Sequence, residues 1–422
     1  MTALSQRLVV VPALGGAAWR LALPLGALHA AMFVYDLAHP GRFVNADRAG
    51  ERIQVVAGFG EAMQSGDPLA YLTSHGIVGD WLPQALLYAA GGQYFVIAAQ
   101  VLLALASVLW VHEIGLRLGL RENAAQGAAL LYALLPHTLV FPHQLASEAI
   151  SVPLVILAFR LAAGGAGLAI GLATLVRPIT ALWPLIHVFA KEKRRAYLLL
   201  AFAPLLAWMS VVFVATGEFS MGRSGHDLGN NIYYRLQRIG GALPPAERPA
   251  VRPDGETKAT LGEYVAFAVS HPAVMAKYAA IDMAVMGFKS GIERLVLDYL
   301  YLYPAERSEL KVAETGWRSR VDSGGAGALL ELARQQPVLI ATATTGALAF
   351  TLLMLFAVYG AARWARSPER LALVAFVIYI FATTQAVDAA QSRLRAPAEF
   401  AICLLAIAGW QALKRRARRH GG

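Results

Sequence analysis

Charged side chains are scarce in this sequence of 422 residues. They make up 15% of it, against about 25% in a typical soluble domain, whereas hydrophobic residues make up 57%. Several stretches of roughly 17–25 residues lack charge almost entirely, which is the length that a helix needs to cross about 30 Å of hydrocarbon. The composition therefore predicts a polytopic membrane protein and excludes a soluble enzyme, a disordered chain and an outer-membrane barrel.

The chain also lacks the residues that several catalytic chemistries require. Its single cysteine, Cys403, lies in an apolar run, which excludes an intrachain disulfide, a CxxC redox motif and a cysteine-based zinc site. Walker A, HExxH and GxSxG motifs are absent, so ATP-driven, zinc-protease and hydrolase-elbow chemistries have no support. We expect no cofactor, and no residue pattern calls for a divalent metal.

The apolar runs predict an all-α protein with about ten transmembrane helices, amphipathic periplasmic helices and one long periplasmic segment. The spans are expected near residues 13–35, 91–111, 124–141, 147–163, 165–176, 178–190, 196–215, 338–361, 371–387 and 397–413. We divide the chain into an N-terminal transmembrane module at 1–215 with its first periplasmic loop at 36–88, a periplasmic or interfacial segment at 216–337, and a C-terminal transmembrane module at 338–422 with a basic tail. Within the second unit, 272–303 is predicted to be amphipathic.

Basic residues are distributed unevenly between the two sides of the predicted membrane. The loops on the side of the termini contain fifteen Lys and Arg residues, and the short loops on the opposite side contain six. By the positive-inside rule, this asymmetry predicts that both termini are cytoplasmic in a bacterial inner membrane. The net charge of +10 therefore reflects topology and does not indicate a nucleic-acid partner.

The first outer loop offers the best candidate for a catalytic base. In the stretch NADRAGER, Asp47 follows the first predicted span by one short segment. A half-dry cleft at a membrane edge can raise the pKa of a carboxyl group, which makes the group a useful general base. The alternative is a solvated loop acid that pairs with Arg48 or Arg52.

Three arginines lie on the side of the membrane where the positive-inside rule disfavours them. Arg177 is in LVRPITALWP, and Arg393 and Arg395 are in QSRLRAPAEF, with a proline close after each that ends the neighbouring helix. Guanidinium groups match phosphate oxygens, and a lipid phosphate lies at this depth. We expect the three side chains to converge on one phosphate site. The alternatives are snorkelling to lipid headgroups and pairing with Asp388 or Glu399.

Further polar residues are candidates for substrate contacts on the same side. His75 and Asp80 lie in LTSHGIVGDW, His143 and Glu148 lie in FPHQLASE, and Asn230, Asn231 and Tyr234 lie in GHDLGNNIYYR. Acids and imidazoles over a cleft can hold polar ligands, whereas amides and tyrosines suit sugar hydroxyls. Each also has a structural interpretation, as a satisfied turn histidine, a helix-capping acid or an ordinary Gly-Asn-Asn turn.

The order of these motifs resembles the bacterial GT-C glycosyltransferases that use polyprenyl-phosphate sugars, a group that includes lipid A aminoarabinose transferase and protein O-mannosyltransferases. The resemblance covers most of the chain and rests on NADRAGER, GDWLPQALLY, PHQLASEAISVPL, GLATLVRPITALWP followed by KEKRR, a GNN loop and RLRAP. It implies that Asp47 is the catalytic base and that Arg177, Arg393 and Arg395 bind the donor phosphate. The sequence departs from the aminoarabinose and mannosyl branches in two places. Asp47 is followed by Arg where Glu is common, and no HPP-type motif occurs near His75.

The expected reaction is inverting transfer of a sugar from a polyprenyl-phosphate donor to an envelope glycan, lipid or protein acceptor. Because a lipid phosphate is already a good leaving group, one carboxylate and a few arginines would suffice. An O-antigen ligase or polymerase that uses a lipid-diphosphate glycan is the alternative enzyme. A secondary transporter is disfavoured because almost all ionisable residues fall at predicted span ends or in loops. A non-catalytic membrane scaffold would leave the outer arginines unexplained.

Overall fold

The computed structural model describes residues 16–44, 49–66, 68–75, 78–221, 223–241, 243–244, 259–292, 295, 299, 327, 330–331, 334–335, 337–387 and 392–420. Within these ranges every regular element is a helix, as the composition predicts, and no strand occurs. A helix satisfies its backbone hydrogen bonds within itself, which is what an apolar solvent requires.

The longer helices are α1 (Gly16–Ala38), α2 (Ala49–Ser65), α4 (Val78–Arg117), α5 (Glu122–Ala133), α7 (Glu148–Arg160), α8 (Ala163–Val176), α10 (Arg194–Thr216), α11 (Arg223–Gly240), α12 (Leu261–Ser270), α13 (Pro272–Phe288), α16 (Pro337–Trp364), α17 (Pro368–Val387) and α18 (Glu399–His420). The short helices are η1 (Pro40–Val44), α3 (Pro68–Ser74), α6 (Pro136–Val140), η2 (Phe141–His143), η3 (Pro178–Thr180), α9 (Trp183–His187), η4 (Val188–Ala190) and η6 (Ser392–Ala398).

Five of the described helices are long and apolar enough to cross a membrane, and a bent pair of helices would make a sixth span. The five cover Arg20–Ala38, Val78–Arg117, Arg194–Thr216, Ile340–Trp364 and Arg393–Arg419, and the bent pair joins Glu122–Ala133 to Pro136–His143. The expected ten spans are thus not confirmed. The difference arises mainly in the middle of the chain, where α7 has 13 residues and α8 has 14. Helices of this length extend for about 20 Å, which is less than the thickness of the hydrocarbon core.

The long helix α4 is broken near its first third. Gly91 and Gly92 are not helical, and Gly92 has a φ of 69°, in the left-handed region that glycine adopts without strain. The break separates a segment that begins at Val78 from the predicted span 91–111. The two glycines therefore lie where the predicted span begins.

Glycines allow two helix pairs to pack closely. A Cβ atom at Gly167 or Gly171 of α8 would collide with backbone carbonyls of α10. A Cβ atom at Gly360 of α16 would collide with the Leu405 carbonyl of α18. Such close approach of small residues is how helices associate where lipid removes the hydrophobic driving force.

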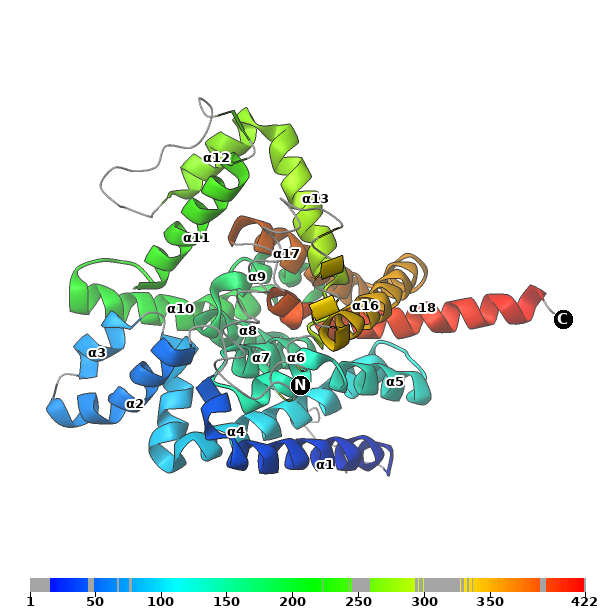
Figure 1. Ribbon diagram of the computed structural model, residues 1–422, viewed down its shortest axis with the longest axis horizontal. Helices are drawn as coiled ribbons and strands as arrows, with labels where there is room; N and C mark the ends of the chain where they lie inside the picture. Colours follow the sequence, from blue (N-terminus) through cyan, green and yellow to red (C-terminus); the bar gives the residue numbers. More distant parts are fainter. Residues whose placement is uncertain are drawn as a thin grey trace, which may run out of the picture.

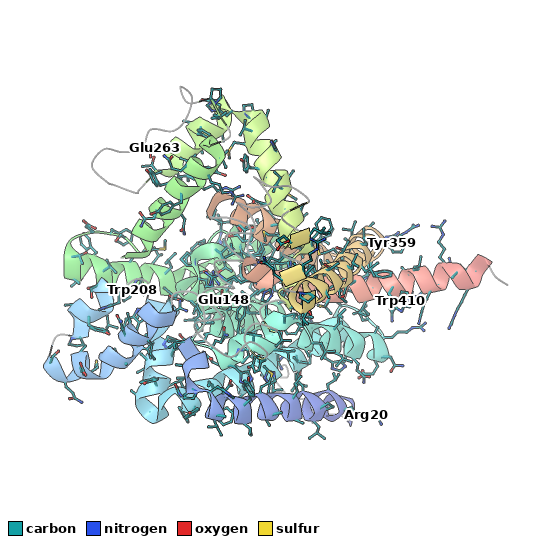
Figure 2. The ribbon with its side chains drawn as sticks, viewed as in Figure 1. Arg20, Glu148, Trp208, Glu263, Tyr359 and Trp410 are labelled. Atoms are coloured by element: carbon teal, nitrogen blue, oxygen red, sulfur yellow. The ribbon has the colours of Figure 1, made fainter. Side chains whose placement is uncertain are left out.

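The helices form one bundle that combines the two predicted transmembrane modules. The C-terminal helix α18 packs against both α16 and α5. In Figure 1, α2 and α3 lie at the end of the bundle away from the C-terminus, while α11, α12 and α13 rise beside it as an arch with α12 at the apex. Figure 2 shows Glu148 within the bundle, whereas Glu263 lies on the arch.

Candidate functional site

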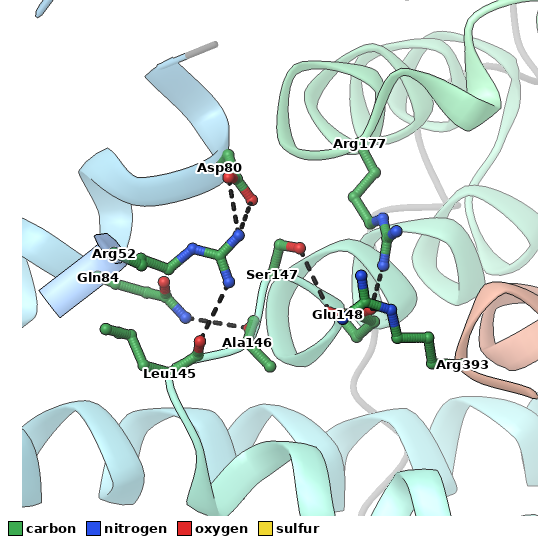
Figure 3. Close-up of polar contacts among 9 residues, drawn as sticks. All are labelled: Arg52, Asp80, Gln84, Leu145, Ala146, Ser147, Glu148, Arg177 and Arg393. Atoms are coloured by element: carbon green, nitrogen blue, oxygen red, sulfur yellow. Dashed lines mark hydrogen bonds and ion pairs between the residues drawn. The ribbon is translucent and has the colours of Figure 1, made fainter. Parts of the chain in front are cut away.

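Several helix ends meet around Glu148, the first residue of α7. Arg177 lies between α8 and η3, and Arg393 lies in η6. Figure 3 shows both arginine side chains reaching the Glu148 carboxylate from different elements. Arg177 has an extended backbone (φ −144°, ψ 112°), because the following residue, Pro178, disfavours helix at the position before it. The proline therefore ends α8 and frees Arg177 to turn towards α7.

The Glu148 carboxylate bridges the two arginines. It bonds directly to Arg177, and its Oε1 lies 3.9 Å from Nε of Arg393. The Glu148 side chain is only 4% exposed, so its charge has lost most of its contact with water. Loss of hydration destabilises a carboxylate unless opposite charges compensate. The two guanidinium groups supply that compensation and keep Glu148 ionised.

A second ion pair lies beside this cluster. Arg52 of α2 donates from Nη2 to both carboxylate oxygens of Asp80, at 2.8 and 2.9 Å, and from Nη1 to the Leu145 carbonyl at 3.1 Å. The Leu145 amide in turn donates to the Phe43 carbonyl at 2.9 Å. The described residues on both sides of Asp47, in η1 and α2, thus contact the turn that leads into α7.

This turn is held in place by side chains as well as by the backbone. Gln84 donates from Nε2 to the Ala146 carbonyl at 3.0 Å, and the Ser147 hydroxyl lies 3.3 Å from Oε2 of Glu148. All four residues from Leu145 to Glu148 are buried. The position of the Glu148 carboxylate is therefore set by a packed turn and not by a mobile side chain on the surface.

Arginines outnumber acids among the described residues of the cluster. Three guanidinium groups, of Arg52, Arg177 and Arg393, face two carboxylates, of Asp80 and Glu148. Asp47 and Asp388 lie outside this count. Guanidinium groups favour phosphate and carboxylate oxygens as ligands.

Arg395 does not join this cluster, which corrects the expectation that it converges on one site with Arg177 and Arg393. Its guanidinium donates to Oε1 of Glu399 at 3.1 and 3.2 Å and to the Lys289 carbonyl at 2.8 Å. The side chain is fully buried. Glu399 lies four residues further along the chain, within reach of the same helical turn, and it satisfies Arg395 locally.

Buried histidines form contacts that the sequence analysis does not predict. Nδ1 of His143 lies 2.5 Å from Oδ2 of Asp36, and Nε2 of His143 lies 2.9 Å from Nδ1 of His29. His143 therefore fits its structural interpretation as a satisfied turn histidine. The available signal was the spacing of His29 and Asp36, because residues seven apart share one face of a helix.

An open pocket of about 670 Å³ lies between α2 and α3. It is lined by Gln54, Val55, Gly58, Glu61, Ala62, Ser65, Tyr71 and His75. The His75 ring packs on Tyr71, with 4.1 Å between the ring centroids. Burial, and next the nearby Glu61, raise the pKa of Tyr71. The pocket falls within the volume range of small-molecule sites, about 300–1,000 Å³. Of the two candidates in LTSHGIVGDW, His75 therefore lines a pocket, whereas Asp80 pairs with Arg52.

Asn230, Asn231 and Tyr234 lie within α11, which corrects the expectation of a Gly-Asn-Asn loop. Ile232 and Leu236 follow at helical spacing and are buried in a small apolar cluster of the arch. Burial of this apolar face outweighs the local turn preference of glycine and asparagine. The three candidates are thus on the arch and not on the elements that surround Glu148.

The predicted base Asp47 and the alternative partner Asp388 lie outside the described residues. Among the residues that the structure does describe, no three His, Cys, Asp or Glu side chains gather in a way that could hold a metal ion. Comparison of the chain with known protein families, curated proteins and solved structures gave no match.

Proposed function

We propose that the chain is an inverting GT-C glycosyltransferase that moves a sugar from a polyprenyl phosphate to an envelope acceptor at the periplasmic face of the inner membrane. The observation that supports this proposal is the arginine cluster around Glu148 (Arg52, Arg177, Arg393, Asp80 and Glu148), in which two guanidinium groups from different elements meet at one buried carboxylate. A polyprenyl-phosphate sugar is a phosphodiester and carries one negative charge. Guanidinium groups bind phosphate oxygens through charge-assisted hydrogen bonds, so the residue types of the cluster suit this donor.

In the proposed reaction the arginines act on the leaving group. The acceptor hydroxyl attacks the anomeric carbon, and the bond between that carbon and the phosphate oxygen breaks. Its electron pair stays with the phosphate, which changes from a diester to a monoester and gains negative charge. Arg177 and Arg393 then interact more strongly with the transition state than with the bound donor, which lowers the barrier. Glu148 holds the two guanidinium groups in position before the donor arrives.

Asp47 is the proposed general base. The motif resemblance assigns this role to it, and in sequence it lies between Phe43 and Arg52, which both contact the turn before α7. The carboxylate accepts the proton of the acceptor hydroxyl as the new glycosidic bond forms. Direct displacement by the acceptor inverts the anomeric centre, because no covalent glycosyl-enzyme intervenes.

The pocket between α2 and α3 is a suitable place for the polar part of the acceptor. Gln54, which lines it, is on the same helix as Arg52, on a different face of α2. The carboxylate of Glu61, the amide of Gln54 and the imidazole of His75 can all bind hydroxyl groups. This placement supports an acceptor that approaches from the side of α2 and α3, opposite the C-terminus.

The donor is tested with undecaprenyl phosphate, the lipid part common to donors of this type whatever their sugar. We expect the protein in lipid nanodiscs to bind it, and Asp47→Asn to bind it equally well. With an undecaprenyl-phosphate hexose and an envelope extract as acceptor source, Asp47→Asn should release undecaprenyl phosphate roughly 10²-fold more slowly than wild type. Asp67→Asn, in the same outer loop, is the matched control and should retain wild-type turnover.

Each result has a different meaning for the proposal. Wild-type turnover in Asp47→Asn would remove Asp47 from the reaction but leave the donor class intact. Binding of an undecaprenyl-diphosphate glycan in place of undecaprenyl phosphate would favour the ligase or polymerase alternative. Binding of neither lipid would contradict the proposed function as a whole.

A further inference from the structure

The arch of α11, α12 and α13 packs on the bundle through its two arms. α13 packs against α16 and α17, and α11 packs against α17. Figure 1 shows α12 at the apex, away from the bundle. The sequence analysis assigns residues 216–337 to a periplasmic or interfacial segment, and the part at 261–288 contains the charged residues Glu263, Lys277 and Asp282. The direction in which those charges face leads to a different assignment for α12 and α13.

The outward surface of the arch is apolar. On α12, Leu261, Val265 and Val269 are exposed, and their spacing of four residues places them on one face of the helix. Val269 is 74% exposed. On α13, Ile281 and Phe288 are also exposed. Soluble proteins rarely leave contiguous apolar surface of this kind in water.

The acidic residue of α13 faces inward. Asp282 of α13 is fully buried and accepts hydrogen bonds from Arg235 and Arg238 of α11, each at 2.6 Å. Met286, four residues after Asp282, is buried on the same side of α13 and accepts a hydrogen bond from Thr384 of α17 at 2.9 Å. A helix whose acid points into the protein and whose apolar side chains point out matches an apolar surrounding.

Two further charged residues occur between 261 and 288, and neither needs an aqueous surface along the arch. Glu263 accepts from the Thr260 amide at 2.6 Å in a capping box at the start of α12, so a local partner satisfies it. Lys277 has a long apolar stem that lets its ammonium group reach the level of lipid headgroups. Both charges are thus compatible with lipid around the rest of the two helices.

We infer that α12 and α13 are immersed in the bilayer, with the exposed face of the arch in contact with lipid acyl chains. Arg395 of η6 holds the end of α13 against the bundle through the Lys289 carbonyl. The exposed residues Leu348 and Leu352 of α16, in a candidate membrane span, provide continuity, because α13 packs directly on that helix. The inference requires a membrane protein but does not depend on glycosyltransferase activity.

Spin labels can test this placement. Val265→Cys, Val269→Cys and Ile281→Cys are made separately in a Cys403→Ala background and labelled with a nitroxide in lipid nanodiscs. Collision rates are measured with oxygen, which concentrates in hydrocarbon, and with a water-soluble nickel chelate. Leu352→Cys on α16 is the lipid control, and Glu61→Cys on α2 is the water control. All five substituted side chains are exposed, so the label does not have to enter the core.

We expect the three arch positions to behave as Leu352→Cys does, with frequent oxygen collisions and nickel collisions several-fold rarer than at Glu61→Cys. Nickel collisions as frequent as at Glu61→Cys would place the arch in water and overturn the inference. Low collision rates with both reagents would show that protein, such as a second copy of this chain, covers the surface, and would overturn it equally. Size-exclusion chromatography of each labelled variant confirms that it is folded before the comparison is made.

Discussion

Replacing Arg177 by alanine should destabilise the protein far more than replacing Arg393. Arg177 bonds directly to the Glu148 carboxylate, whereas Arg393 approaches it only to 3.9 Å. Arg177→Ala therefore leaves a buried carboxylate without its hydrogen-bonded counter-ion. Arg393→Ala leaves the bond between Glu148 and Arg177 intact. The two substitutions remove the same charge from the same cluster, so they form a matched pair.

The burial of Glu148 sets the magnitude of this difference. Its side chain is 4% exposed, and removing one partner of a buried ion pair lowers the free energy of unfolding by about 3–5 kcal/mol. Arg393→Ala removes a longer contact with Glu148 from a side chain that is 25% exposed. We expect the loss of this contact to cost about 1 kcal/mol, the upper range for partly exposed pairs. Arg177→Ala combined with Glu148→Ala should recover part of the loss, because the unpaired carboxylate is then gone.

The effects of these arginine substitutions on donor binding should rank differently from their effects on stability. If Arg393 contacts the lipid phosphate, its loss removes a charge-assisted hydrogen bond of about 1.5–3 kcal/mol, which corresponds to roughly tenfold to 150-fold weaker binding. Arg393→Lys should restore binding only in part, because an ammonium group lacks the planar fork. Arg393→Ala would then be a nearly stable variant that binds undecaprenyl phosphate poorly.

Two assays separate these effects. Denaturant titration in mixed micelles, followed by tryptophan fluorescence, gives the relative stabilities. Binding of undecaprenyl phosphate to nanodisc samples, at a temperature where each variant is folded, gives the affinities. Equal stability of Arg177→Ala and Arg393→Ala would contradict the description of Glu148 as a buried carboxylate that depends on Arg177. Wild-type affinity in both variants would remove the arginines from the donor site.

Two further predictions concern other parts of the bundle. Burial, assisted by the nearby Arg117, lowers the pKa of Lys191 from 10.5 to about 8. Its acylation rate by acetic anhydride should therefore level off near about pH 9, whereas an ordinary lysine gains reactivity up to about pH 11. Peptide mass spectrometry measures the rate, and a rise that continues to about pH 10 would contradict the lowered pKa. Gly360→Ala should destabilise the protein, because the added Cβ atom would collide with the backbone of α18. The matched variant Gly26→Ala in α1 adds a Cβ atom that meets no atom within 4 Å, and it should stabilise the protein by roughly 0.5–1 kcal/mol. A loss of stability in both variants would indicate that close packing is not the cause.

The sequence predicts those features of the site that depend on neighbouring residues. The sequence predicts that Pro178 ends the helix before it, and α8 does end at Val176, with Arg177 in an extended conformation. The pairing of Arg395 with Glu399, four residues apart, was also open to sequence reasoning and stood among the alternatives. Only the assumption that the three outer arginines act together placed Arg395 elsewhere.

The partner of Arg177 was not predictable in the same way. Glu148 lies 29 residues earlier in the chain, and Arg393 approaches it from a third element. Such a pairing depends on how α7, α8 and η6 pack together, and no local sequence pattern predicts that packing. The predicted number of ten spans is not confirmed, for a related reason. An apolar stretch such as α7 can be buried on all sides by protein as well as by lipid, and hydropathy does not separate the two cases.

The arch shows that charged residues, like apolar stretches, do not reveal their surroundings from the sequence alone. The segment 261–288 contains Glu263, Lys277 and Asp282, and these charges favour an aqueous location when residues are counted along the sequence. Counting treats each charge as exposed, yet Asp282 is fully buried between Arg235 and Arg238. The Asp282 carboxylate does not meet lipid, because it is buried with Arg235, whereas the Arg238 side chain is 31% exposed. The solvent that suits a helix therefore depends on the residues on its exposed face, which here are mostly apolar but include Glu263 and Lys277. That face becomes known only when the partner helix is placed.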